Sequence, residues 1–160
     1  MNQEPGCRLC FSRGLQFKYK INSYTLEKCR VCGFLQIREQ PKAKELAEIY
    51  SPSYFDNEKY RDKFSLNLEN KRRLRFMKRQ KIPKRSKVLE IGCAAGDFID
   101  YAKNDFDMWG LDPSRYAIEI ARQKNPEIAN QIMAGEIESF DYKAGFFEAI
   151  VLWDVLEHLW

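Results

Sequence analysis

The sequence predicts an α/β fold with a partial parallel sheet of about four strands and helices on both faces, preceded by a small four-cysteine domain. Two observations lead to this prediction. From residue 87 onward, short apolar segments alternate with amphipathic segments, which is typical of strand–helix repeats with parallel strands. Before them, within residues 7–32, four cysteines form two closely spaced pairs.

Composition is consistent with a folded chain that does not enter a membrane. Apolar residues make up 44% of the 160 residues, which is enough for a core. No apolar run approaches the ~20 residues that span a bilayer, and the N-terminus lacks the basic and apolar regions of a signal peptide. We therefore expect a cytoplasmic protein without a membrane partner. Its expected segments are a cysteine domain at 1–40, a helical linker at 41–86 and the α/β part at 87–160.

The cysteine pairs have the spacing of a four-cysteine zinc site. Each pair encloses two residues, and eighteen residues separate the pairs. Alternating residues over 15–19 and 24–28, with a turn at 22–23, would add a hairpin and complete a zinc ribbon. Two disulfides are the alternative, although thiols stay reduced in the cytoplasm. Four protein ligands leave no open coordination position, so we expect a structural Zn²⁺ held by Cys7, Cys10, Cys29 and Cys32.

The linker is expected to contain a short helix over 41–50, a tyrosine-rich joint and a basic helix over 61–81. Residues 59–87 hold thirteen Lys or Arg against two acids, a local balance of +11, whereas the net charge of the whole chain is +4. Such a helix could bind phosphates of a nucleic acid, attract an anionic substrate, or be a solvated face. The sequence leaves these three interpretations open.

The α/β part reads as two strand–helix units followed by two further strands. We expect strands over 87–91 and 108–111, each followed by a helix, over 96–103 and 114–124, the second one capped by Ser114. Further strands are expected near 131–133 and over 149–153. In such a sheet the ligand lies across the carboxyl ends of the strands, near the point where the strand order reverses.

Two features mark the carboxyl ends of the first two expected strands. Gly92 and Gly96 lie in a turn of small residues, where a ligand could come close to the backbone. Asp112 follows about 20 residues later, where an acid can accept both hydroxyls of a ribose. A helix N-cap or turn acid is the alternative for Asp112. Together the features indicate a nucleotide-like ligand.

Three motifs resemble the class I S-adenosylmethionine (SAM) dependent methyltransferases. They are LEIGCAAG at residues 89–96, GLDPS at 110–114 and WDVLEHL at 153–159. The resemblance covers roughly residues 87–160, and Ala94 stands where the middle glycine of the family's turn is expected. It implies a Rossmann-like sheet and a SAM cofactor. A ribbon, a short helix and a tyrosine-rich joint are similar to the front of bacterial methyltransferases that act on sugars, glycan precursors or other small metabolites.

The resemblance also implies roles at the cofactor. Glu90 would organise the turn and reach the SAM methionine amine, Glu136 would accept from the adenine amino group, and Ile137 would pack near the ring. Trp153 would lie where cofactor and acceptor meet. Tyr50, Tyr54, Phe55 and Tyr60 would pack nearby or only join the domains. The full set expected at the cofactor is Glu90, Gly92, Cys93, Ala94, Gly96, Asp112, Pro113, Glu136, Ile137 and Trp153, with Cys93 a small filler.

Glu157 and His158 follow the last expected strand, and His158 is the single histidine of the chain. An imidazole with an ordinary pKa of about 6.5 suits proton abstraction near neutrality. Similar methyltransferases that work on sugar carbons or small hydroxyls place a Glu–His pair there. A structural histidine at the start of a helix is an equally good interpretation.

The chain stops just after the fourth expected strand, where the resembled family normally continues with three more strands. We therefore expect a fragment, or a homo-oligomer that pairs through the exposed edge of the sheet. The leading hypothesis is methyl transfer to a small-molecule acceptor such as a sugar or glycan precursor, with an anionic acceptor as an open variant. An RNA-modifying methyltransferase and a non-enzymatic zinc-ribbon assembly module are the alternatives.

Overall fold

The computed structural model describes residues 6–39 and 63–158, which belong to two separate compact units. The helix expected over 41–50 and the ring residues Tyr50, Tyr54, Phe55 and Tyr60 lie outside the described residues. No helix within the two described ranges combines the length and the apolar character needed to cross a membrane.

The first unit is a small antiparallel sheet in the order β1-β2-β3, formed by β1 (Leu15–Ile21), β2 (Tyr24–Cys29) and β3 (Leu35–Ile37). The hairpin predicted between the first two strands is confirmed, with Asn22 at its turn in the left-handed region, where asparagine is well tolerated. The sequence analysis missed β3, because three residues are too few to show an alternating pattern.

Little apolar surface is buried in this unit. Cys7 and Cys29 are the fully buried apolar side chains within residues 6–39, while aromatic side chains such as Phe11 and Phe17 are exposed. Polar side chains fill other interior positions, including Glu27, which accepts a hydrogen bond from Arg38 Nε at 2.9 Å. A domain with so small a core usually depends on a metal or on disulfides for its stability.

The second unit contains a parallel sheet of four strands, as the sequence predicts. Its strands are β4 (Lys87–Ile91), β5 (Asp107–Asp112), β6 (Ile132–Ala134) and β7 (Ala149–Leu152), in the order β6-β5-β4-β7. The chain adds β5 and β6 on one side of β4 and then crosses to place β7 on the other side. The strand order therefore reverses between β4 and β7, and β4 is buried in the middle of the sheet.

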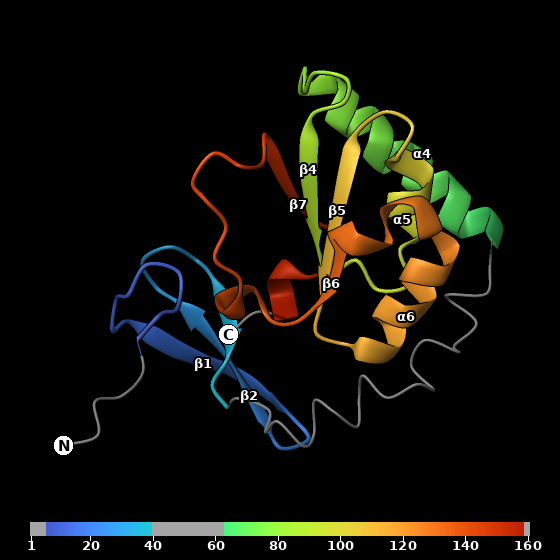
Figure 1. Cartoon of the computed structure of the whole chain (residues 1–160). Helices are drawn as coiled ribbons and strands as arrows, with labels where there is room; N and C mark the ends of the chain where they lie inside the picture. Colours follow the sequence, from blue (N-terminus) through green and yellow to red (C-terminus); the bar gives the residue numbers. More distant parts are fainter. Residues whose placement is uncertain (1–5, 40–62, 159–160) are drawn as a thin grey trace. The chain divides into compact units, whose positions relative to one another are not determined.

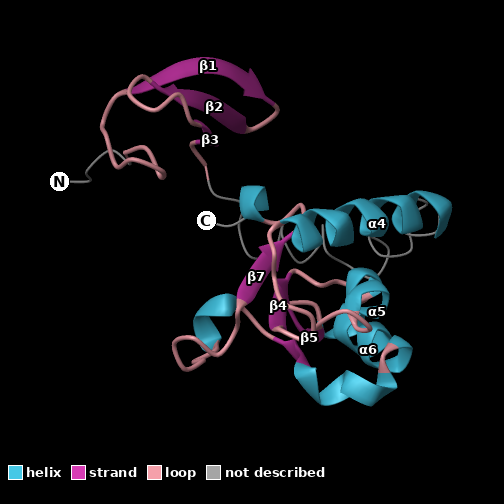
Figure 2. Ribbon diagram, turned by 90° about the horizontal axis from the view of Figure 1, so that it is seen from above, coloured by secondary structure: helices cyan, strands magenta, loops and turns pink. Residues whose placement is uncertain are grey.

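Three helices pack on one side of this sheet: α4 (Lys63–Arg79), α5 (Asp97–Ala102) and α6 (Arg115–Lys124) (Figures 1 and 2). Ser114 caps α6 as predicted, because its hydroxyl accepts from the Ala117 N–H at 3.3 Å. The helices meet the sheet in an apolar cluster with Val88, Met108 and Ile132 on the strands and Phe98 and Ile118 among the helical members.

The opposite face of the sheet presents Leu89, Ile91 and Leu111. Where helices were expected on both faces, residues 136–148 cover this face in the described structure, with one short 3₁₀ helix, η2 (Ile137–Ser139). The remaining 3₁₀ helices are η1 (Pro126–Gln131) and η3 (Leu156–His158). Aromatic side chains provide most of the cover, and they are Trp109, Phe140, Tyr142, Phe146 and Phe147.

The basic helix α4 is an integral part of the second unit. Leu74 and Met77 enter the apolar cluster, and Met77 is only 1% exposed. The basic side chains lie around this buried stripe, and one of them, Lys78, forms an ion pair with Asp105 at 2.8 Å. The helix predicted over 61–81 is thus confirmed.

We expect Met77→Ala to lower the free energy of unfolding by about 2–4 kcal/mol, because it leaves a cavity under α4. Leu68→Ala, on an exposed position of the same helix, should cost less than about 1 kcal/mol. Urea unfolding of both variants checks this. Equal effects of the two substitutions would show that α4 does not depend on Met77 for its attachment.

Candidate functional site

The turn between β4 and α5 is fastened to the neighbouring strand β5. The N–H groups of Gly92 and Cys93 both donate to the carbonyl oxygen of Leu111, at 2.7 and 3.1 Å. The next N–H, of Ala94, donates to Asp112 Oδ2 at 2.9 Å. These three N–H groups therefore fix the course of the turn rather than remain free for a ligand.

Glycine is required at both ends of the turn, and Gly92 and Gly96 have φ angles of 73° and 71°. A Cβ atom on Gly92 would lie 2.3 Å from Val155 Cγ2, and one on Gly96 would lie 2.9 Å from Ala121 Cβ. From the sequence we expect this space to admit a ligand. In the structure the protein's own side chains occupy it, so the turn packs tightly against α6 and the segment after β7.

Ala94 adopts the left-handed conformation, with φ 46°, at the position where a glycine was expected. For a residue with a Cβ this conformation costs about 1–2 kcal/mol. The hydrogen bond from its N–H to Asp112 offsets part of that cost. The chain thus retains the backbone course of a glycine turn with alanine in it.

Asp112 joins two connections at the carboxyl end of β5. It is 8% exposed, and its Oδ1 accepts from the Ser114 N–H at 2.8 Å while Oδ2 accepts from Ala94. Burial raises the pKa of this carboxyl above its ordinary value, and the two N–H donors oppose that effect. Each carboxylate oxygen has a second lone pair, so Asp112 retains acceptor capacity for two hydroxyl groups.

Glu90 is a buried acid with an unused acceptor. It lies near the carboxyl end of β4, is 3% exposed, and its Oε2 has no hydrogen-bond partner within the described residues. Burial raises the pKa of Glu90 to about 8; nearby Arg73 acts in the opposite direction, and the acids Asp97 and Asp112 add to the rise. A buried carboxyl without a donor is costly, and a cationic ligand would remove that cost.

Trp153 lies just after β7, beside the helices that cover the sheet. Its ring meets Phe98 of α5 edge-on at 5.7 Å and Phe76 of α4 at 6.2 Å between centroids. The Arg73 guanidinium lies over the indole at 5.4 Å and pairs with the Asp154 carboxylate at 3.0 Å. Sequence analysis did not single out Arg73, because a run of basic residues on a helix does not show which of them faces the sheet.

The other residues expected at the site differ in how far they are exposed. Pro113, Glu136 and Ile137 are exposed, and the Gly135 N–H donates to the Asp112 carbonyl oxygen at 3.0 Å, which brings this segment to the end of β5. Cys93 is buried beside Gly110, and burial raises the pKa of its thiol. Glu157 is exposed in η3, and the side chain of His158 lies outside the described part of the chain.

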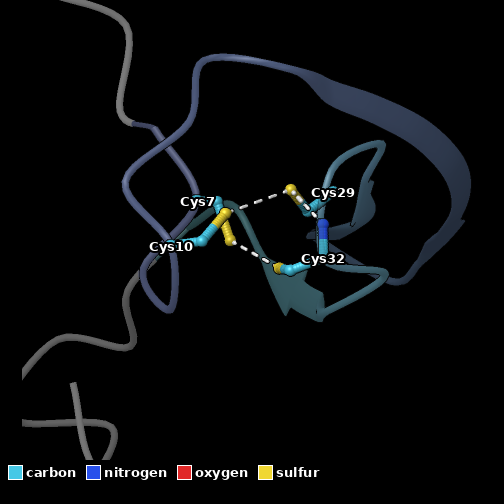
Figure 3. A group of neighbouring side chains, drawn as sticks. All are labelled: Cys7, Cys10, Cys29 and Cys32. Atoms are coloured by element: carbon cyan, nitrogen blue, oxygen red, sulfur yellow. Dashed lines mark hydrogen bonds between the residues drawn. The ribbon is translucent and has the colours of Figure 1, made fainter.

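The four cysteines of the first unit come together as a tetrad (Figure 3). Their sulfur atoms lie within 4.8 Å of one another, with 3.6 Å between Cys7 and Cys32 and 3.6 Å between Cys10 and Cys29. Four thiolates around a tetrahedral Zn²⁺ are about 3.8 Å apart, given Zn–S bonds of about 2.3 Å. The tetrad therefore has the size of a four-cysteine metal site.

Donors around Cys29 favour its thiolate, the form that binds metal. The Ser12 hydroxyl lies 3.2 Å from Cys29 Sγ, and the N–H groups of Val31 and Cys32 donate to the same sulfur at 3.3 and 3.5 Å. With the Ser12 contact the largest cause, they lower the pKa of Cys29 to about 5. These donors favour the thiolate at one of the four sulfurs, whereas desolvation and the neighbouring thiols raise the pKa of Cys32.

A family model described as a methyltransferase domain matches residues 58–159 of the chain. The match includes α4, the turn, the four-stranded sheet and the segment after β7. No curated protein matches the chain.

Several solved methyltransferase structures are similar. Magnesium protoporphyrin IX methyltransferase (ChlM) from Synechocystis PCC 6803 is 19% identical with a TM-score of 0.54, over 69% of this chain and 57% of that one. A TehB-like SAM-dependent methyltransferase from Corynebacterium glutamicum is 24% identical with a TM-score of 0.47, over 64% and 55%. The plantazolicin methyltransferase BpumL is 26% identical with a TM-score of 0.34, over 42% and 26%.

The chain thus spans little more than half the length of the first two of these proteins and about a quarter of BpumL. The likeness to ChlM shows the fold, a Rossmann-like sheet with flanking helices, as the sequence predicts.

We expect Glu90→Gln to change how stability depends on pH. The unfolded chain releases the Glu90 proton near pH 4.5 and the folded chain near pH 8, so the folded state holds the extra proton between these values. The contribution of Glu90 to the free energy of unfolding therefore falls as pH rises through this window, by about 1.4 kcal/mol per unit.

The glutamine variant lacks that fall, so its stability relative to the original chain should increase from pH 5 to pH 8. Urea unfolding at both pH values, on metal-loaded protein, measures the difference. A constant offset between the two chains would contradict a buried, protonated Glu90.

Proposed function

The chain belongs to the methyltransferase-domain family, and from this membership we propose that it transfers a methyl group from SAM to a small-molecule acceptor. The observation that supports this most is the pair of buried acids, Glu90 and Asp112, at the carboxyl ends of the adjacent strands β4 and β5. Ligands of open α/β sheets bind at this end of the strands.

The donors and acceptors of the cofactor suit these two acids. The unpartnered Glu90 Oε2 can accept from the α-ammonium group of the methionine moiety, which would also stabilise the charged carboxylate. The free lone pairs of Asp112 can accept the two ribose hydroxyls. Glu136 and Ile137, exposed beside the end of β5, are the proposed neighbours of the adenine.

SAM supplies an electrophilic methyl group on a sulfonium. The task of this chain's residues is to bring the acceptor into line with that carbon and to exclude water. Trp153, packed between Phe76 and Phe98, is a rigid apolar wall beside the turn. For a hydroxyl or acidic-carbon acceptor, we propose Glu157 and His158 as the pair that removes the proton.

For the acceptor, a sugar or glycan precursor remains our leading proposal, and transfer to RNA is the second candidate. RNA binding would need the basic side chains of α4 to face solvent freely. Two of them are already used within the unit, since Arg73 pairs with Asp154 and Lys78 pairs with Asp105. Each of these two ion pairs reduces the positive charge that α4 can offer to a nucleic-acid backbone.

We further propose that the cysteine tetrad holds a structural Zn²⁺ in a reducing, cytoplasmic setting. A four-sulfur site leaves the metal no open position for catalysis. Within residues 6–39 the fully buried apolar side chains are two of the cysteines themselves, so the metal would contribute most of the folding free energy.

Asp112→Ala should abolish measurable binding of S-adenosylhomocysteine, since it removes the ribose acceptors and the bond that holds Ala94. Asp107→Ala is the matched control, because Asp107 lies at the other end of the same strand. Calorimetric titration of both variants, with circular dichroism and zinc content measured on the same samples, makes the test.

Binding should survive in the Asp107 variant, and zinc content should be equal in both. Unchanged affinity in a folded Asp112→Ala protein would remove the proposed cofactor site.

Cys29→Ser should lose equimolar zinc, because one of four sulfur ligands is replaced by a poor one. Cys93→Ser should keep its zinc, since Cys93 is remote from the tetrad in sequence and lies in the other unit. Metal analysis of the purified proteins distinguishes the two. The same zinc content in both variants would show that the tetrad is not the metal site.

A further inference from the structure

A shallow, open surface cavity of about 270 Å³ lies between α4 and the residues that follow β7. Its lining consists of Glu69, Arg72, Arg73, Phe76, Trp153 and Asp154. The cavity begins where the sheet ends, because Trp153 and Asp154 directly follow β7. It therefore lies at the carboxyl end of β7, the same end of the sheet at which Glu90 and Asp112 lie.

Both acids of the lining are bound to the same cation. Arg73 pairs with Glu69 at 3.2 Å and with Asp154 at 3.0 Å, while its guanidinium lies over the Trp153 ring. The negative charges of the cavity are thus partly neutralised from within. Arg73 itself is held in place by these three contacts.

Arg72 is the cation of the lining that is left without an ion pair. Arg72 is exposed and forms no ion pair with any described residue. The rest of α4 adds to this polarity, since residues 63–79 contain seven basic side chains and one acid. A ligand that pairs with Arg72 must offer an acceptor, preferably with negative charge.

We propose that this cavity binds a phosphate group of the acceptor, with Arg72 as its principal donor. The proposal rests on the proposed function and narrows it to phosphate-bearing small molecules. The volume lies near the lower end of the range for ligand pockets. It therefore suits the phosphate group and an adjoining ring of the acceptor rather than a whole ligand. Phe76 and Trp153 form the apolar wall for that ring.

Inorganic pyrophosphate is the probe, titrated calorimetrically into the full chain with and without S-adenosylhomocysteine. Arg72→Ala should weaken pyrophosphate binding about tenfold or more, as loss of a charge-assisted donor does. Lys71→Ala is the matched control, because it removes the same charge from the same helix outside the cavity. It should change the affinity less than about threefold.

Asp154→Asn is expected to tighten binding, a result that misfolding of the variant could not produce. It removes a negative charge from the lining and one partner of Arg73, so pyrophosphate should bind several times more tightly. Asparagine tolerates the left-handed conformation that Asp154 adopts at φ 56°, which protects the fold.

The outcomes separate the cavity from its alternatives. Equal losses in the Arg72 and Lys71 variants would overturn the proposal in favour of a polyanion such as RNA lying along the helix. No pyrophosphate binding, or loss of S-adenosylhomocysteine binding alone in Arg72→Ala, would also overturn it, the latter by assigning Arg72 to the cofactor. Failure of the original chain to bind S-adenosylhomocysteine contradicts the proposed function instead, while the pyrophosphate titration still tests the cavity.

Discussion

The carboxylate of Asp112 ties together the two strand-to-helix connections of the second unit. One oxygen holds the Ala94 N–H in the turn between β4 and α5, and the other holds the Ser114 N–H at the start of α6. Because the turn also donates two bonds to Leu111, the ends of β4 and β5 are fixed relative to each other. These bonds fix the course of the turn, and the turn so placed packs against α6 at Gly96 and against Val155 at Gly92.

The same region keeps two acids where an apolar core would be more stable. Glu90 and Asp112 are both buried, and burial raises the pKa of each. Asp112 is partly compensated by its two N–H donors, whereas Glu90 Oε2 has none within the described residues. Unsatisfied buried acceptors reduce stability, and they occur where a ligand supplies the missing donor. The arrangement supports the proposed site for a cationic, hydroxyl-bearing cofactor.

Sequence patterns were sufficient where local chemistry decides the structure. The bounds of β4, the Ser114 cap and the grouping of the four cysteines were all predictable from residue type and order. Other features of the structure could not be predicted from the sequence. The cover of the second sheet face by aromatic side chains, the unused acceptor of Glu90 and the position of Arg73 over Trp153 arise from packing between distant segments. The strand β3 pairs with the nearby β2, and its three residues are too few to show an alternating pattern. The roles of the individual residues at the cofactor stay predictions.

A ¹H–¹⁵N NMR titration of the zinc-loaded chain with S-adenosylhomocysteine tests the central claim most directly, because it locates a ligand residue by residue. The account predicts the largest shift changes at the amides of residues 90–98, 111–114 and 135–137, at the carboxyl ends of β4, β5 and β6. Residues 15–37 of the first unit should be unaffected. Changes confined to that unit, or none at saturating ligand, would contradict a cofactor site built on Glu90, the turn and Asp112.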